Sequence, residues 1–197
     1  MSQVVGILLA AGASQRFGAD KLNHRLADGV SVAVHACRNL FSATDRVFAV
    51  VRPGNQELYA SLQAEGAQVQ FCPDADQGMG NSLAFAVRQC PAATGWVIAL
   101  ADMPWIASST LHTISTAIRN GAHIAAPTWE GQRGHPVGFA HALGAELMAL
   151  SGDAGAKTLI QNHRALLQVF ECNDPAILQD IDTPDDLRAH SNLSPQQ

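Results

Sequence analysis

Arg16 and Lys21 stand in a loop of small side chains and are the first candidates for chemistry in this 197-residue chain. The loop opens with Ala10, Ala11 and Gly12, where no side chain larger than a methyl group keeps a ligand away from the backbone N–H groups. Two cations beside such a loop can neutralise the charge on phosphates. The segment therefore predicts a nucleotide site in which two cations neutralise phosphate charge, the alternative being a plain strand-to-helix connection. The expected nucleotide-binding residues of this loop are Leu9, Ala10, Ala11 and Gly12.

A carboxylate at the end of a predicted strand supplies a second kind of chemistry. Asp102 follows the apolar segment 96–100, and ligands of open α/β sheets bind at the carboxyl ends of strands. An aspartate placed there can hold Mg²⁺ against nucleotide phosphates, although it could also cap the next helix. Near the end of the chain, Asp182, Thr183 and Pro184 form a good helix N-terminus with Thr183 as the cap.

Glycine-bearing segments supply candidate contacts for a base and for a second substrate. Gly78 opens a predicted helix whose N-terminal N–H groups could bind an anion or a base carbonyl, and the Ser82 hydroxyl can hydrogen-bond a base. The alternative for this segment is a helix N-terminus that Asn81 or Ser82 caps. Arg133 and His135, in a later glycine-rich segment, form a cationic, hydrogen-bonding patch suited to a phosphorylated substrate.

An alternation of strands and helices must position these residues. Apolar runs predict strands over 4–9, 46–51, 69–71, 96–100, 124–127, 137–140 and 167–170. Helical spacing predicts helices over 31–40, 57–65, 81–89, 108–120, 142–150 and 156–163. Repeated strand–helix units with uniformly apolar strands favour a mostly parallel sheet that helices cover on both faces.

Composition narrows the function classes. With 47% hydrophobic residues, the chain is predicted to be a single domain over residues 1–190, followed by a disordered tail over 191–197. Only 15% of the residues are charged and the net charge is −5, which argues against a nucleic-acid-binding surface. We expect a cytoplasmic protein, because no segment has the length and pattern of a membrane span or a signal peptide. The scattered cysteines argue against a disulfide framework or a zinc site.

Residues 9–21 read Leu-Ala-Ala-Gly-Ala-Ser-Gln-Arg-Phe-Gly-Ala-Asp-Lys and resemble the nucleotide loop of the MobA-like nucleotidyltransferases. Further motifs at 78–82, 102–104, 134–137 and 182–184 match that family, so the resemblance runs from Gly6 to about Leu187. Leu-Ala-Ala-Gly together with Gly-His-Pro-Val is most similar to the molybdenum cofactor (molybdopterin) cytidylyltransferases. The resemblance implies a Rossmann-like, three-layer α/β sandwich of the nucleotide-diphospho-sugar transferase type.

The resemblance also implies a reaction, the transfer of CMP from CTP to the phosphate of molybdopterin with release of pyrophosphate. The implied metal is Mg²⁺, with Mn²⁺ as a substitute, held by Asp102 and by Asp182 in preference to Asp180. Arg16 would hold the departing phosphates, and Lys21 would stabilise charge on the α-phosphate. Because Lys21 and Asp102 would serve different groups, loss of Lys21 is expected to leave the Mg²⁺ requirement unchanged.

The resemblance implies further roles. Ser82 would lie against the cytosine, and Gly78 would belong to the nucleotide-binding residues. The acceptor-binding residues would be Arg133, Gly134, His135 and Lys157. A molybdoenzyme or its maturation chaperone is the implied protein partner, with no nucleic acid and no membrane. The chain departs from the family after Lys21, where Leu22 is followed by Asn23, so contacts on that side of the loop are expected to differ.

The sequence leaves three alternatives open. The first is guanylyl or other nucleotidyl transfer to a related small phosphate. The second is a molybdopterin-binding assembly partner of a molybdoenzyme without efficient catalysis, and the third is a domain with no nucleotide function. Retention of Arg16, Lys21 and Asp102 argues against a module that only binds, because such a module has less use for a metal aspartate.

Overall fold

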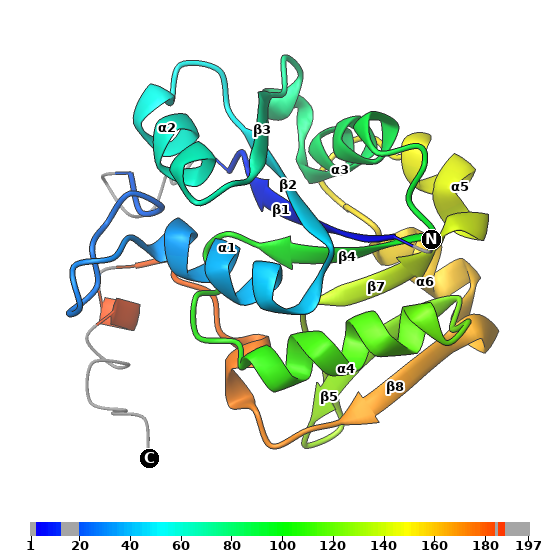
Figure 1. Ribbon diagram of the computed structural model, residues 1–197. Coiled ribbons are helices and arrows are strands. Elements are labelled where there is room, and N and C mark those ends of the chain that lie inside the picture. Colours follow the sequence, from blue (N-terminus) through cyan, green and yellow to red (C-terminus); the bar gives the residue numbers. More distant parts are fainter. Residues whose placement is uncertain (1–2, 13–19, 184, 188–197) are drawn as a thin grey trace.

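Eight strands form one sheet in the computed structural model, which describes residues 3–12, 20–183 and 185–187 (Figure 1). The strands are β1 (Val4–Ala10), β2 (Arg46–Val51), β3 (Gln68–Phe71), β4 (Gly95–Leu100), β5 (Ile124–Trp129), β6 (Gln132–Arg133), β7 (Val137–Ala140) and β8 (Leu167–Glu171). Their order is β3-β2-β1-β4-β7-β5-β6, and β8 pairs with β5. All the predicted strands are present, and β6 is an addition that the sequence pattern did not indicate.

The sheet is mostly parallel, as predicted, with two antiparallel strands. β1 pairs in parallel with β2 and β4, β2 with β3, and β5 with β8. β7 runs antiparallel to both β4 and β5, and β6 runs antiparallel to β5. β5 and β6 are joined by Glu130 and Gly131, both at positive φ, a two-residue connection typical of a tight hairpin. A short connection cannot cross the sheet, so the chain reverses direction here.

Helices cover both faces of the sheet and make it the middle of three layers (Figure 1). The α-helices are α1 (Val32–Ala43), α2 (Gln56–Ala64), α3 (Met79–Gln89), α4 (Ser108–Arg119), α5 (Gly144–Met148) and α6 (Lys157–Asn162). Short 3-10 helices are η1 (Ala75–Gln77), η2 (His141–Leu143), η3 (Arg164–Leu166) and η4 (Pro175–Leu178). The predicted helix 142–150 is thus shorter than expected, because its first turn is 3-10.

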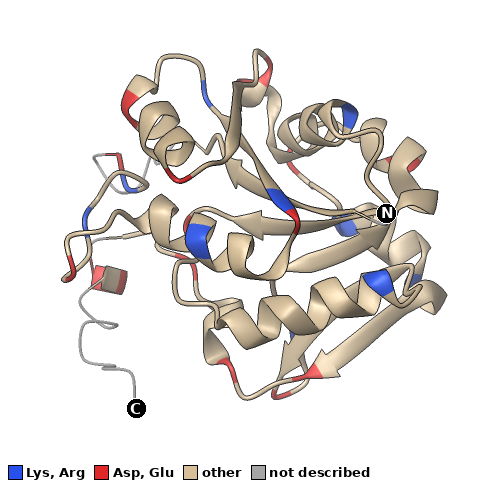
Figure 2. Cartoon of the chain, in the orientation of Figure 1, with Lys and Arg blue, Asp and Glu red and all other residues tan. Residues whose placement is uncertain are grey.

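The core has two halves because successive strand residues point to opposite faces. On β1, Val4 and Leu8 pack with α1, α2 and α4, whereas Val5 and Ile7 pack with α3, α5 and α6. The strands β1, β4, β5 and β7 carry no charged residue, and Figure 2 shows Lys, Arg, Asp and Glu distributed around them. This arrangement confirms the predicted α/β sandwich with a fully covered sheet.

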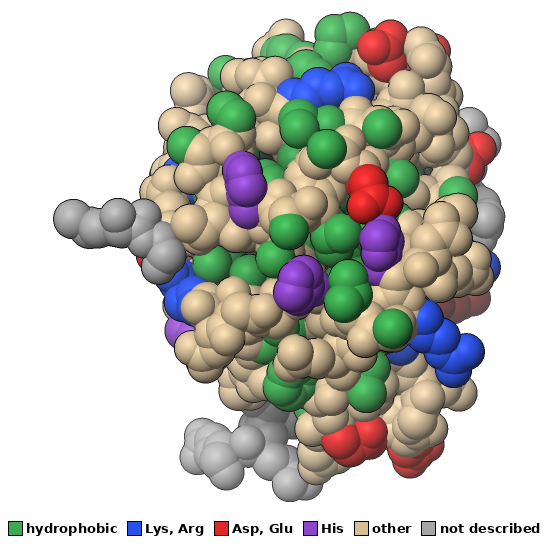
Figure 3. All heavy atoms as spheres, turned by 90° about the vertical axis from the view of Figure 1, so that its right-hand side faces the viewer, with side chains coloured by type: hydrophobic (Ala, Val, Ile, Leu, Met, Phe, Trp, Pro, Cys, Tyr) green, Lys and Arg blue, Asp and Glu red, His purple; other side chains and the backbone are tan. Residues whose placement is uncertain are grey.

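Figure 3 shows the face toward α5 and α6, where histidines lie among apolar side chains. No helix in the described ranges is long and apolar enough to cross a membrane. The predicted tail over 191–197 lies outside the described residues.

Candidate active site

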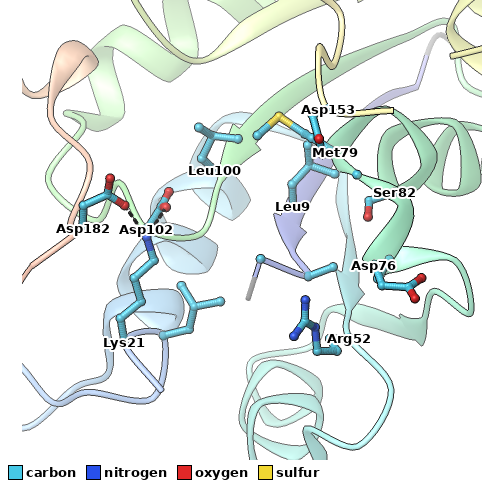
Figure 4. A pocket seen from close by; sticks show the side chains of 15 residues that line it. Leu9, Lys21, Arg52, Asp76, Met79, Ser82, Leu100, Asp102, Asp153 and Asp182 are labelled. Carbon is cyan, nitrogen blue, oxygen red and sulfur yellow. Dashed lines mark hydrogen bonds and ion pairs between the residues drawn. The ribbon is translucent and has the colours of Figure 1, made fainter. Parts of the chain in front are cut away.

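A cleft of about 790 Å³ opens at the carboxyl edge of the central strands (Figure 4). It lies beside the ends of β1, β2 and β4 and the N-terminus of α3, where an open α/β sheet places its ligands. Its size suits a ligand as large as a nucleotide. The lining residues are Leu9, Ala11, Gly12, Lys21, Leu22, Arg52, Ala75, Asp76, Gly78, Met79, Ser82, Leu100, Asp102, Asp153 and Asp182.

An ion-pair cluster stands at one end of the cleft. The Lys21 Nζ atom donates to Asp102 Oδ2 at 2.8 Å and to Asp182 Oδ1 at 3.0 Å (Figure 4). Burial of Lys21 favours its neutral form, but hydrogen bonds and charge from Asp102 and then Asp182 outweigh burial and raise the pKa of Lys21. The ammonium is therefore charged at neutral pH, and the structure brings three of the predicted site residues into direct contact.

The carboxylates at this end fit a hard divalent cation. Asp102, Asp180 and Asp182 each offer an oxygen, and these oxygens all lie within 4.8 Å of one another. Oxygen-only donors are what Mg²⁺ and Mn²⁺ prefer. Although the Asp180 side chain is exposed, partial desolvation and then the charge of Asp102 raise the pKa of its carboxyl group. Asp180, which the sequence ranked below Asp182, belongs to the same cluster.

Hydrogen bonds to the Asp186 carboxylate and to the end of β4 hold the segment that carries Asp182. Asp186 Oδ2 accepts hydrogen bonds from the backbone N–H groups of Asp182 at 3.0 Å and Thr183 at 2.7 Å, and from the Thr183 hydroxyl at 2.9 Å. The Ile181 N–H donates to the Asp102 carbonyl at 3.0 Å. The predicted helix N-terminus at Thr183 is present, with residues 185–187 helical, and it holds Asp182 next to the end of β4.

The glycines at the start of α3 allow a second loop to pack closely. A Cβ atom at Gly78 would overlap the backbone of Gly152, and Gly78 has a φ of 117°. The Gly80 N–H donates to the Gly152 carbonyl at 2.7 Å, and Asn81 Oδ1 accepts from the Gly152 N–H at 2.8 Å. The alternative for this segment, a helix capped by Asn81 or Ser82, is wrong, because the N-cap residue of α3 is Gly78 and no side-chain cap hydrogen bond is present. Ser82 is buried and lines the cleft, as does Gly78.

The first loop is divided between the core and the cleft. Ala11 and Gly12 line the cleft, and Leu9 lines both this cleft and a second cavity. Ala10 does not line either one, because its side chain is buried in the core on the face that α1 covers. Arg16 lies in the segment 13–19, outside the described residues.

A second cavity of about 220 Å³ adjoins the cleft and shares Leu9, Met79 and Leu100 with it. The predicted acceptor residues all line it: Arg133, Gly134, His135 and Lys157. The expected cationic character of His135 is wrong, because burial and then the charge of Arg133 lower its pKa to about 4. The positive charge of this cavity therefore comes from Arg133 and Lys157.

Two details of the second cavity depend on its backbone. A Cβ atom at Gly134 would collide with the carbonyl oxygen of Ile177, and the His135 N–H donates to that oxygen at 2.9 Å. The glycine is thus required by a close backbone approach. Within the described residues, the buried Nδ1 atom of His135 has no hydrogen-bond partner, so its hydrogen-bonding capacity is unused.

Comparison with known proteins places this site in a family. The sequence profile of the MobA-like NTP transferase domain matches residues 6–167. The chain belongs to the MobA-like NTP transferase family. Its fold is accordingly of the nucleotide-diphospho-sugar transferase type, and both the predicted family and the predicted fold class are confirmed.

Relatives of this MobA-like chain cover nearly all of it. The purine catabolism protein PucB of Bacillus subtilis is 29% identical, with 93% of each chain covered. The nicotine blue oxidoreductase of Paenarthrobacter nicotinovorans is 26% identical, with 91% of this chain and 92% of that protein covered. The crystal structure of Rv0371c from Mycobacterium tuberculosis matches with a TM-score of 0.84 and 28% identity over 95% of this chain and 96% of that chain. A second structure of Rv0371c is a complex with manganese, with 27% identity and a TM-score of 0.80.

Sequence reasoning missed several groups of the MobA-like site, above all Arg52 and Asp76. Arg52 follows β2 just as Ala11 follows β1, since Ala10 and Val51 are paired in the sheet. The rule that ligands bind at the carboxyl ends of strands, applied to the second predicted strand as well as the first, would have found Arg52. Asp76 belongs to η1, a three-residue 3-10 helix that is too short to show a periodic pattern in the sequence.

Proposed function

We propose that this MobA-like protein transfers CMP from CTP to the terminal phosphate of molybdopterin, releasing pyrophosphate and forming molybdopterin cytosine dinucleotide. One observation carries the proposal: a cleft of nucleotide size, with Lys21 and metal-competent carboxylates, adjoins a second cavity that holds Arg133 and Lys157. Two adjoining sites of this kind suit a nucleotide donor and a phosphorylated acceptor. Leu9 and Met79 lie where the two meet.

The reaction requires the protein to position the two substrates and to neutralise negative charge on the phosphates. An oxygen of the acceptor phosphate attacks the α-phosphorus of CTP, the new P–O bond forms, and the bond to the β-phosphate breaks as pyrophosphate leaves. Lys21 would stabilise the charge on the α-phosphate, and Arg16 would hold the leaving phosphates. When bound by Asp102 and Asp182, Mg²⁺ or Mn²⁺ supplies further positive charge to the phosphates.

The remaining residues would hold the two substrates. Ala11 and Gly12 would let the nucleotide approach the backbone of the first loop, with Leu9 and Ala10 behind it. Gly78 and Ser82 would contact the base. In the second cavity, Arg133 and Lys157 would bind the acceptor phosphate, Gly134 would leave room for it, and His135 would offer a neutral ring nitrogen.

Cellular roles follow from the same proposal. The product would pass to a molybdoenzyme or to its maturation chaperone, and the protein would work in the cytoplasm without nucleic acid or membrane. The name of its relative PucB, a purine catabolism protein, suggests that the recipient enzyme acts on purines or related heterocycles.

A direct assay tests the proposal. The protein is incubated with each of the four nucleoside triphosphates, Mg²⁺ and molybdenum-loaded molybdopterin, and pyrophosphate release is measured. We expect release with CTP only when the acceptor is present. Release with GTP in place of CTP would favour the guanylyl alternative, and acceptor binding with no release for any nucleotide would favour an assembly partner.

A further inference from the structure

Arg52 lies across β1 from the ion-pair cluster. In the sheet order, β2 and β4 flank β1, with Ala10 paired to Val51 and Leu9 paired to Leu100. The residues just beyond these strands therefore stand side by side along the edge, with Arg52 on one flank and Asp102 on the other. Figure 4 shows the Arg52 side chain between Lys21 and Asp76, nearer to Asp76, with its guanidinium directed toward the middle of the cleft.

The guanidinium of Arg52 has no protein partner among the described residues. No hydrogen bond or ion pair within the described ranges involves it, in contrast to Lys21, which two carboxylates hold. Arg52 and Asp76 line the same end of the cleft, yet within those ranges no ion pair joins them. A half-buried guanidinium that faces a cleft with its donors unused is suited to bind a ligand.

The ligand group near Arg52 is expected to be a base and not a phosphate. The groups suited to phosphates, Lys21 and the carboxylates that fit a metal, lie on the other flank of β1. Asp76 would repel a phosphate placed beside Arg52, whereas it would not repel an uncharged base. Ser82, buried at the same end, adds a hydroxyl that can act as donor or acceptor.

We propose that Arg52 determines base specificity by donating a pair of hydrogen bonds to two adjacent acceptors of the nucleotide base. This inference rests on the proposed nucleotidyl transfer. Guanidinium has only donors, arranged as a planar fork. Cytosine presents O2 beside N3 and guanine presents O6 beside N7, so both match the fork. Uracil has an N–H at N3, and adenine places an amino group beside its ring acceptors, so both mismatch it.

The test measures binding of CTP, CDP, CMP and UTP by titration calorimetry at one fixed Mg²⁺ concentration. Wild type is compared with Arg52→Met, which has a similar length but no donor, and with Arg52→Lys, which keeps the charge but lacks the fork. We expect both variants to bind CTP, CDP and CMP roughly tenfold or more weakly, by a similar factor for all three. UTP binding should change little, so the preference for CTP over UTP falls. In turnover, KM for CTP should rise while kcat stays close to wild type.

Arg46→Met is the matched control, because Arg46 starts the strand β2 whose end carries Arg52, and it bonds Gln68 far from the cleft. This control should bind all four nucleotides like wild type, and thermal melts verify that each variant is folded. Three results would overturn the role of Arg52 and leave the proposed function intact. They are unchanged CTP binding in folded Arg52→Met, full rescue of CTP binding by Arg52→Lys, and a loss of affinity that grows with the number of phosphates. Absence of any nucleotide binding by the wild-type protein would overturn the proposed function as well.

Discussion

Lys21 and Asp102 are 81 residues apart in sequence, and their side chains form an ion pair of 2.8 Å. Asp102 is also one of three carboxylates whose oxygens could hold a divalent cation. The ammonium of Lys21 therefore neutralises part of the charge that a metal would neutralise. The sequence-based expectation that Lys21 and the metal act independently does not fit this contact, because both interact with the same carboxylates.

Replacing Lys21 should strengthen metal binding while it weakens catalysis. In Lys21→Met, Asp102 and Asp182 lose their counter-charge, so a cation meets a more negative site. We expect the Kd for Mn²⁺ without nucleotide, measured by electron paramagnetic resonance, to fall by roughly tenfold. The kcat should fall by roughly 10²-fold or more. Lys21→Arg keeps the charge and is the control; equal Mn²⁺ affinity in Lys21→Met and wild type would contradict the coupling.

Removing the charge of Asp102 should have the opposite effect on metal binding. In Asp102→Asn, the cation loses a negatively charged ligand and Lys21 keeps only Asp182 as an ion-pair partner in the part of the chain that the structure describes. We expect kcat to fall by roughly 10²-fold or more and the Mg²⁺ concentration for half-maximal rate to rise. Asp153→Asn is the matched control. It removes one negative charge from the cleft at a position outside the three-carboxylate cluster, so it measures the effect of charge without the loss of a metal ligand. Full activity of Asp102→Asn at ordinary Mg²⁺ would leave Asp182 as the main ligand.

Protonation of His135 should destabilise the fold in mild acid. Burial, followed by the charge of Arg133, lowers the pKa of His135 to about 4 in the folded chain, against an ordinary value of 6.5. The folded state favours the neutral ring, so this contribution to stability is present above pH 6.5 and is lost as pH falls from 6.5 through 4. The loss at pH 5 is about 2 kcal/mol. Urea unfolding of His135→Gln between pH 7 and pH 4.5 should show a shallower pH dependence than wild type, and equal slopes would refute the assignment.

The size of residue 11 should influence base choice. Ala11 is buried and lines the cleft, so its methyl group narrows the space beside the first loop and is expected to favour a pyrimidine over a purine. We expect kcat/KM for CTP to exceed that for GTP by at least ~10-fold, about 1.4 kcal/mol. Ala11→Gly should reduce this ratio without abolishing turnover. A wild-type preference for GTP, or equal use of both nucleotides, would show that the methyl group does not select the base.

The sequence by itself determined the order of the elements and the ends of the strands that carry the site. Apolar runs such as 4–9 and 96–100 indicate buried strands, because a strand that is apolar on both sides is stable only where helices pack on both faces of the sheet. From those strands, Ala11 and Asp102 could be placed at the carboxyl edge. Thr183 could be placed at a helix start, because capping depends on residues close in the chain.

Only the tertiary structure decided which of these groups meet. The pairing of Lys21 with Asp102 and Asp182, the inclusion of Asp180, and the placement of Arg52 across β1 from Asp102 depend on how strands far apart in sequence lie side by side. The neutral state of His135 depends on its burial. Burial is set by residues that are distant in sequence, so it cannot be predicted from the residues next to His135 in the chain. Local patterns encode periodicity and capping, whereas contacts between distant residues and the pKa shifts they cause arise from packing.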